Sequence, residues 1–95
     1  LALKYDKFFK NIDGIDFINQ PENSSSNYWL QAVILKDVKT RDEFLKFTNK
    51  NGVMTRPVWK LMNKLEMFKD CQSSDLTNSK ICEERIVNIP SSVIL

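Results

Sequence analysis

The longest nearly continuous apolar stretch of this chain runs only from Trp29 to Leu35, and Gln31 interrupts it. A helix that spans a membrane needs about 20 apolar residues, so this stretch is too short to form one. Its aromatic and branched side chains are typical of a strand, and we predict a strand over residues 28–35. A chain of 95 residues with apolar runs this short can form one small domain, and we assign residues 1–95 to it.

The first residues carry the signal of an amphipathic helix. Leu1, Tyr5, Phe8 and Ile12 recur at helical spacing, and the polar residues that lead to Gly14 end the pattern. No capping residue precedes this helix, and the chain does not begin with Met. We therefore expect the sequence to be a piece of a longer chain.

Two further helices are expected. Thr40 and Glu43 have the spacing of a capping box, which predicts a helix that begins at Thr40 and is terminated by Asn51 and Gly52. Asn78 is a candidate cap for a third helix over residues 78–87, with Asn88, Ile89 and Pro90 as its terminator.

The remaining regular segments are short. Residues 16–19 and 53–55 are expected to be extended, residues 60–65 to form a helical turn, and residues 92–95 to form an extended tail. Pro57 predicts an irregular turn because it has no backbone N–H to donate. We therefore predict an α+β domain with a small two- or three-stranded sheet and about three helices packed on one face.

Composition excludes several kinds of chemistry. The chain has no histidine, so Ser-His-Asp and Cys-His catalysis are excluded, and its two glycines cannot form a glycine-rich phosphate loop. Cys71 and Cys82 are too few for a cysteine-only zinc site, and we expect free cytosolic thiols rather than a disulfide. The net charge is only +2, with acids and bases interleaved, so no surface for nucleic acid or membrane is expected.

Several motifs together carry a family resemblance. Residues 27–30 are Asn-Tyr-Trp-Leu, residues 41–45 are Arg-Asp-Glu-Phe-Leu, residues 51–59 are Asn-Gly-Val-Met-Thr-Arg-Pro-Val-Trp, residues 61–65 are Leu-Met-Asn-Lys-Leu, and residues 84–92 are Glu-Arg-Ile-Val-Asn-Ile-Pro-Ser-Ser. This order resembles the C-terminal domain of the DegT/DnrJ/EryC1/StrS aminotransferases over nearly the whole chain. The nearest subgroup aminates nucleotide-linked 4-keto-6-deoxy sugars for bacterial surface glycans. Related sequences commonly have histidine at the position of Asn63 and proline at that of Glu66, which leaves the substrate subgroup open.

The resemblance implies a bacterial cytoplasmic parent enzyme with an aspartate-aminotransferase-type fold and pyridoxal phosphate (PLP) as its cofactor. A large domain would carry the Schiff-base lysine, and the small domain would cover the cleft near the interface of a homodimer. An amino donor, expected to be glutamate, would supply the amino group for the keto sugar. The chain by itself contains no catalytic or cofactor-binding residue that we can assign, so we expect it to be inactive alone.

The resemblance also implies three substrate-binding candidates. Arg56 suits a diphosphate or a carboxylate because guanidinium groups bind such groups in a bidentate manner, although a surface salt bridge is the alternative. Trp59 could stack on a sugar or a base, and core packing is its alternative. Asn63 is a candidate only through its place in the motif. Four carboxylates are interpreted as solvated or capping groups: Asp13, Asp16, Glu83 and Glu84.

A second interpretation is an independent protein-interaction module. Its binding surface would consist of Trp59, Met62, Met67 and Phe68, because exposed aromatic and methionine side chains mark interfaces. The length of the parent gene separates the two interpretations. An open reading frame that extends far upstream of Leu1 favours the enzyme.

Overall fold

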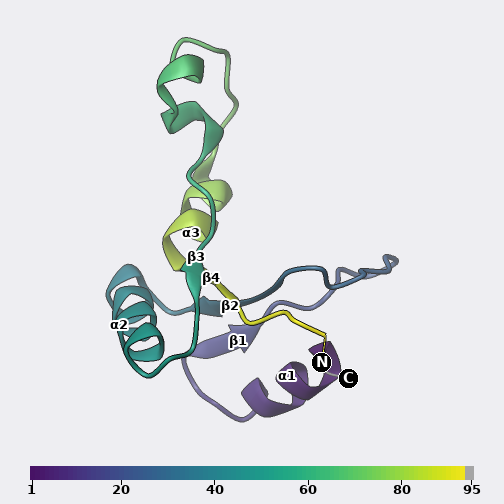
Figure 1. The fold of residues 1–95 in the computed structure, drawn as a ribbon. Helices are drawn as coiled ribbons and strands as arrows, with labels where there is room; N and C mark the ends of the chain where they lie inside the picture. The colour runs from purple at the N-terminus through teal and green to yellow at the C-terminus, as the bar shows by residue number, and fades with distance from the viewer. Residues whose placement is uncertain (94–95) are drawn as a thin grey trace.

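A four-stranded antiparallel sheet with helices packed on one face forms the body of the domain (Figure 1). The computed structural model describes residues 1–93. The elements in chain order are α1 (Ala2–Phe9), β1 (Ile15–Phe17), β2 (Gln31–Leu35), α2 (Val38–Lys50), β3 (Arg56–Pro57), the 3₁₀ helices η1 (Met62–Lys64) and η2 (Glu66–Phe68), α3 (Thr77–Arg85) and β4 (Ile86–Ile89). The strand order is β1-β2-β4-β3, so the α+β class and the three α-helices predicted from the sequence are confirmed.

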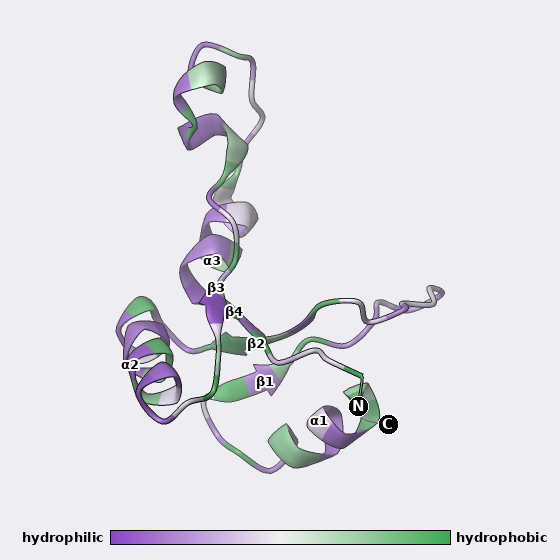
Figure 2. Ribbon diagram, in the orientation of Figure 1, coloured by the Kyte–Doolittle hydropathy of each residue, from purple (hydrophilic) through white to green (hydrophobic). Residues whose placement is uncertain are grey.

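Alternating residues of three strands form the core. The buried apolar side chains are Ile15, Phe17, Val33, Leu35, Val87 and Ile89. Cross-strand pairs such as Val33 opposite Val87 place them on one face of the sheet, as the two-residue period of a strand requires. Phe9 of α1 and Phe44 of α2 pack against this face, and Figure 2 shows apolar colouring on β2, on part of β1 and on parts of α1 and α2.

The fourth strand was not expected. Residues 86 and 87 are predicted to lie in the third helix, with Asn88 to Pro90 as its end, but α3 ends at Arg85 and Ile86–Ile89 is the strand β4. Three of the four residues of β4, Ile86, Val87 and Ile89, are β-branched, and the strand pairs its backbone with both β2 and β3. The prediction of two or three strands is therefore too low.

The connection into α2 differs from the predicted capping box. The N-cap is Asp37, whose carboxylate accepts a hydrogen bond of 2.7 Å from the Thr40 N–H, and the helix begins at Val38. Thr40 therefore lies inside the first turn, as a backbone donor to the cap. The predicted end of this helix is correct, since Gly52 follows it with a φ of 80°.

The cap predicted for α3 is also wrong. Asn78 lies inside the helix, and the N-cap position is Leu76, whose side chain makes no capping hydrogen bond. The carboxylate of Asp75 instead accepts hydrogen bonds from the Thr77 N–H at 3.1 Å and from its hydroxyl at 2.6 Å. An Asp that precedes a Thr by two residues can make such a local turn without the spacing of a capping box.

The remaining extended segments are shorter than predicted or displaced. β2 begins at Gln31 rather than at residue 28, because Tyr28 has a φ of 49°, which a strand cannot continue. The extended segment expected at residues 53–55 is displaced to Arg56–Pro57, and Pro57 is accommodated because β3 is an edge strand. Residues 94 and 95 of the expected C-terminal tail lie outside the described residues.

A long arm leaves the body of the domain after β3. It contains η1 and η2, projects away from the sheet and returns through α3 into β4 (Figure 1). Within residues 1–93, none of the helices combines the length and the apolar character needed to cross a membrane.

Candidate functional site

The guanidinium group of Arg56 lies exposed at the edge of the sheet. Arg56 stands opposite Asn88 in the β3–β4 pairing. Its Nη1 donates to the Thr55 carbonyl at 3.0 Å and, at 3.4 Å, to Oδ1 of Asn49. Within residues 1–93, no carboxylate forms an ion pair with this guanidinium. The surface salt bridge raised as the alternative for Arg56 is therefore absent from the described residues. The positive charge of its guanidinium is accessible to an anionic ligand.

The backbone that carries Arg56 is anchored through Thr55, which is only 2% exposed. Its hydroxyl lies 2.6 Å from the hydroxyl of Thr48 and accepts a hydrogen bond of 3.0 Å from Nδ2 of Asn49. Both partners belong to the last turns of α2. Pro57 restricts the backbone on the other side of Arg56. An exposed cationic side chain on a held backbone is suited to binding an anionic group.

Trp59 lies just beyond β3 with 75% of its surface exposed. Core packing, the alternative raised for this residue, is therefore wrong for this chain. Trp59 lines a hollow of about 360 Å³ together with Leu61 and Ser79. Its exposed indole ring can offer an apolar face to a flat or partly apolar ligand.

Asn63 lies in η1 and lines a second hollow, of about 500 Å³. Its Oδ1 is buried and makes no hydrogen bond within residues 1–93. Leu61 and Ser79 line both hollows, so Trp59 and Asn63 face neighbouring spaces. Arg56 lines neither of the two. The structure thus places Trp59 and Asn63 beside neighbouring hollows, whereas Arg56 lies apart from them in β3, where the arm begins.

Glu83, interpreted from the sequence as a solvated or capping carboxylate, connects the arm to the body. Its Oε2 accepts a hydrogen bond of 2.6 Å from the Leu61 N–H, and its Oε1 forms an ion pair with the Lys64 ammonium. These two donors, the ammonium first, hold the pKa of the Glu83 carboxyl below its ordinary value. The interpretation was therefore wrong for Glu83, while Asp13, Asp16 and Glu84 are exposed as it requires.

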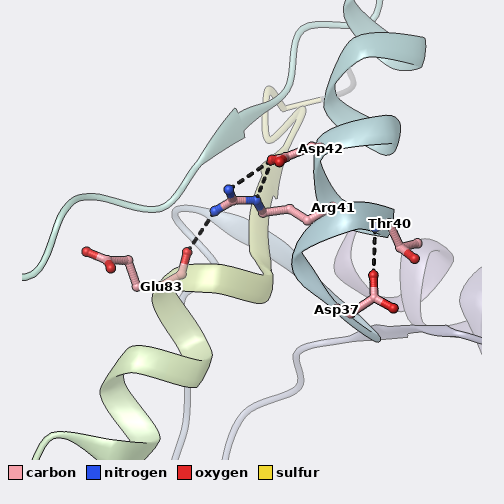
Figure 3. A network of polar contacts seen from close by, with 5 residues as sticks. All are labelled: Asp37, Thr40, Arg41, Asp42 and Glu83. Carbon is pink, nitrogen blue, oxygen red and sulfur yellow. Dashed lines mark hydrogen bonds and ion pairs between the residues drawn. The ribbon is translucent and has the colours of Figure 1, made fainter.

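Arg41 links the same residue to α2. Its Nη1 donates to the backbone carbonyl of Glu83 at 3.0 Å, while Nε and Nη2 bind Oδ1 of the neighbouring Asp42. Figure 3 shows the carbonyl of Glu83 facing Arg41 and its carboxylate pointing away from it. No sequence signal marks this link, since Arg41 and Glu83 are far apart in the chain and meet only when α2 and α3 pack together.

The described part of the chain offers no metal site and no bridged cysteines. Cys71 and Cys82 are both exposed and free. Residues 1–93 contain no group of three or more cysteine, aspartate or glutamate side chains that could hold a metal ion.

Comparison with solved structures places this fold among aminotransferases. The aminotransferase TlmJ from Streptoalloteichus hindustanus superposes with a TM-score of 0.80 at 20% sequence identity, over 95% of this chain and 24% of that chain. The sugar aminotransferase CalS13 from Micromonospora echinospora gives a TM-score of 0.75 at 20% identity, over 95% of this chain and 23% of its own. This chain therefore spans about a quarter of the length of either structure.

The sequence comparison agrees with the structural one. The profile of the DegT/DnrJ/EryC1/StrS aminotransferase family matches residues 1–95. The chain belongs to this family. Comparison with curated protein sequences gave no match.

Proposed function

We propose that this chain is the C-terminal small domain of a PLP-dependent aminotransferase that aminates a nucleotide-linked 4-keto-6-deoxy sugar. The family match over all 95 residues is the observation that carries the proposal. The parent enzyme is then a cytoplasmic bacterial homodimer of surface-glycan biosynthesis with glutamate as the amino donor. One of the two similar structures is named a sugar aminotransferase, which supports a sugar as the acceptor.

We assign Arg56, Trp59 and Asn63 to substrate binding. The guanidinium of Arg56 pairs with the diphosphate of the nucleotide sugar or with the donor carboxylate, and its exposure and lack of an ion pair within residues 1–93 support this role. Trp59 stacks on the sugar or the base, which its 75% exposure permits. The amide of Asn63, at the wall of the hollow of about 500 Å³, hydrogen-bonds a hydroxyl or amide of the substrate.

The residues of this chain do not fit the cofactor itself. PLP needs a lysine for its Schiff base, and such a lysine sits in an enclosed site that controls its protonation. Every lysine of this chain is exposed. We therefore assign PLP to a large domain of the parent enzyme and expect this chain to act only on the substrates.

Two assays test the proposal. The full-length enzyme, mixed with PLP, glutamate and a nucleotide-linked 4-keto-6-deoxy sugar, is expected to form the 4-amino sugar, detected by mass spectrometry. Absence of that product with every sugar of this class would contradict the proposal. The isolated chain mixed with PLP is expected to show no stoichiometric internal-aldimine band, and a band abolished by replacing one particular lysine would contradict the assignment of the cofactor.

One observation favours a second candidate function, a protein-interaction module. Trp59, Met62 and Met67 are 75%, 62% and 75% exposed along the arm, with Phe68 half-buried beside them. Exposed side chains of these types are enriched at protein interfaces. An open reading frame that begins just before Leu1 would favour this function, whereas one that extends some hundreds of residues upstream favours the enzyme.

A further inference from the structure

The carboxylate of Glu83 holds both ends of the turn that carries Asn63. Leu61, whose N–H donates to Oε2 at 2.6 Å, is the N-cap residue of η1, and Lys64, whose ammonium binds Oε1, is its last residue. Asn63 lies between these two contacts, and Trp59 lies two residues before the first. One side chain of α3 therefore holds both ends of this turn.

Other side-chain contacts do not hold the arm in this way. Within the described residues, two sets of side-chain hydrogen bonds connect residues 59–76 with the rest of the chain: the local turn between Asp75 and Thr77, and the two that Glu83 accepts from Leu61 and Lys64. Backbone hydrogen bonds inside the arm are local, such as Lys64 N–H to the Leu61 carbonyl. The last contact of the sheet ladder is made earlier, from the Val58 N–H to the Ile86 carbonyl at 3.4 Å. The position of η1 thus depends strongly on Glu83.

The environment of this carboxylate favours a strong contact. Its side chain is only 14% exposed, whereas that of Lys64 is 43% exposed. Hydrogen bonds to an ionised group are shorter and about twice as strong as those between neutral groups. The Glu83 carboxylate therefore makes its polar contacts with Leu61 and Lys64 of the arm. Loss of its negative charge is expected to weaken both of these contacts.

The same residue connects the arm with the anchor of Arg56. The Glu83 carbonyl accepts a hydrogen bond from Arg41 near the start of α2, and Thr48 and Asn49 near the end of α2 hold Thr55. Both anchors thus belong to one helix, α2.

We propose that Glu83 is a positioning residue that holds Trp59 and Asn63 in the arrangement that binds the nucleotide sugar. The inference rests on the proposed function, because it assumes that these two side chains contact that substrate. Glu83 itself does not touch the substrate, and it acts through the backbone of residues 59–64.

The test compares Glu83→Gln with Glu84→Gln in the full-length enzyme. Glu84 is the adjacent, exposed residue of α3 and forms no ion pair within residues 1–93, so it is a matched control for the loss of one negative charge. Hydrogen exchange is measured for peptides that cover residues 59–65, and steady-state kinetics are measured with the keto sugar. Glu83→Asp keeps the charge on a shorter side chain and serves as the conservative variant.

Glu83→Gln is expected to speed exchange in residues 59–65 by about 10-fold and to raise KM for the keto sugar by about 10-fold, with kcat within about 3-fold, because a neutral amide weakens both contacts. Glu84→Gln is expected to behave as the wild type, and Glu83→Asp to recover part of the loss. Should Glu83→Gln fail to fold, Lys64→Gln takes its place in the comparison, because it removes one of the same contacts at a side chain that is more exposed than that of Glu83.

Two results would overturn the inference. One is unchanged exchange in residues 59–65 for Glu83→Gln, and the other is faster exchange without a change in KM. Failure of the proposed function has a different signature, because the wild-type enzyme would then aminate no sugar of this class. The exchange of residues 59–65 would in that case decide by itself whether Glu83 positions the segment.

Discussion

The hydroxyl groups of Thr48 and Thr55 lie 2.6 Å apart, one in the last turns of α2 and the other directly before β3. Thr55 is among the most buried residues of the domain, at 2% exposure. A buried hydroxyl without partners would destabilise the fold, so this pair and the amide of Asn49 fix the residue that precedes Arg56. Hydrogen bonds within a polar cluster thus hold Thr55 in place, whereas apolar packing holds the core residues of the sheet.

Replacing Thr55 tests this cluster. Thr55→Val keeps the shape of the side chain but removes the hydroxyl that binds Thr48 and Asn49. We expect a loss of about 1–2 kcal/mol in the free energy of unfolding, measured by chemical denaturation. Thr40→Val is the control, because Thr40 also belongs to α2 but lies beside the exposed Asp37 cap in its first turn, away from the Thr55 cluster. It should change stability by less than about 0.5 kcal/mol. Equal effects of both variants would show that the hydroxyl of Thr55 has no special role.

The cap at Asp37 predicts a dependence of stability on pH. The Thr40 N–H holds the pKa of the Asp37 carboxyl below its ordinary value in the folded chain. The charged carboxylate therefore stabilises the fold at pH values above the unfolded pKa, and this contribution is lost as pH falls through the folded pKa.

Asp37→Asn keeps an acceptor for the Thr40 N–H but does not titrate. We therefore expect the melting temperature of the wild type to fall more steeply than that of Asp37→Asn between about pH 5 and pH 2. Asp37→Ala should be less stable than both at neutral pH. Parallel curves for the wild type and Asp37→Asn would contradict the assigned role.

Exposed aromatic side chains predict self-association of the isolated chain. Phe8 on α1 is 64% exposed, while its neighbour Phe9 packs against the core. We expect dye binding and sedimentation to report association above that of a typical small monomer, and Phe8→Ser to reduce both. Lys7→Ser changes a neighbouring exposed polar residue and should not reduce them. A monomer at high concentration that gives no dye signal would argue against an exposed docking face.

Arg56→Ala in the full-length enzyme tests the anion-binding role. Loss of a charge-assisted contact is expected to lower kcat/KM by roughly 10- to 150-fold for whichever substrate Arg56 touches. Stability should change by less than about 0.5 kcal/mol, because the guanidinium is exposed and binds only a carbonyl and an amide oxygen within residues 1–93. Arg56→Lys should recover part of the activity, since an ammonium lacks the planar fork. Unchanged kinetics, or a large loss of stability, would show that Arg56 is structural.

Local signals were sufficient for part of the fold. The apolar period of α1, the glycine that follows α2 and the branched residues of β2 each depend on neighbours within a few positions, and the sequence alone determined these elements and the α+β class. The family motifs likewise identified Arg56, Trp59 and Asn63 as candidates without showing how these residues lie relative to one another.

The tertiary structure decided what depends on distant residues. Ile86–Ile89 continues directly from a helix, and it becomes a strand because β2, more than fifty residues earlier, supplies its hydrogen-bond partners and completes the buried pair of Val33 and Val87. Glu83 resembles any surface carboxylate until the packing of α3 brings it to Leu61 and Lys64. Propensity is a property of a short window of sequence, whereas strand pairing and burial are properties of the whole chain, and the latter determined these two features.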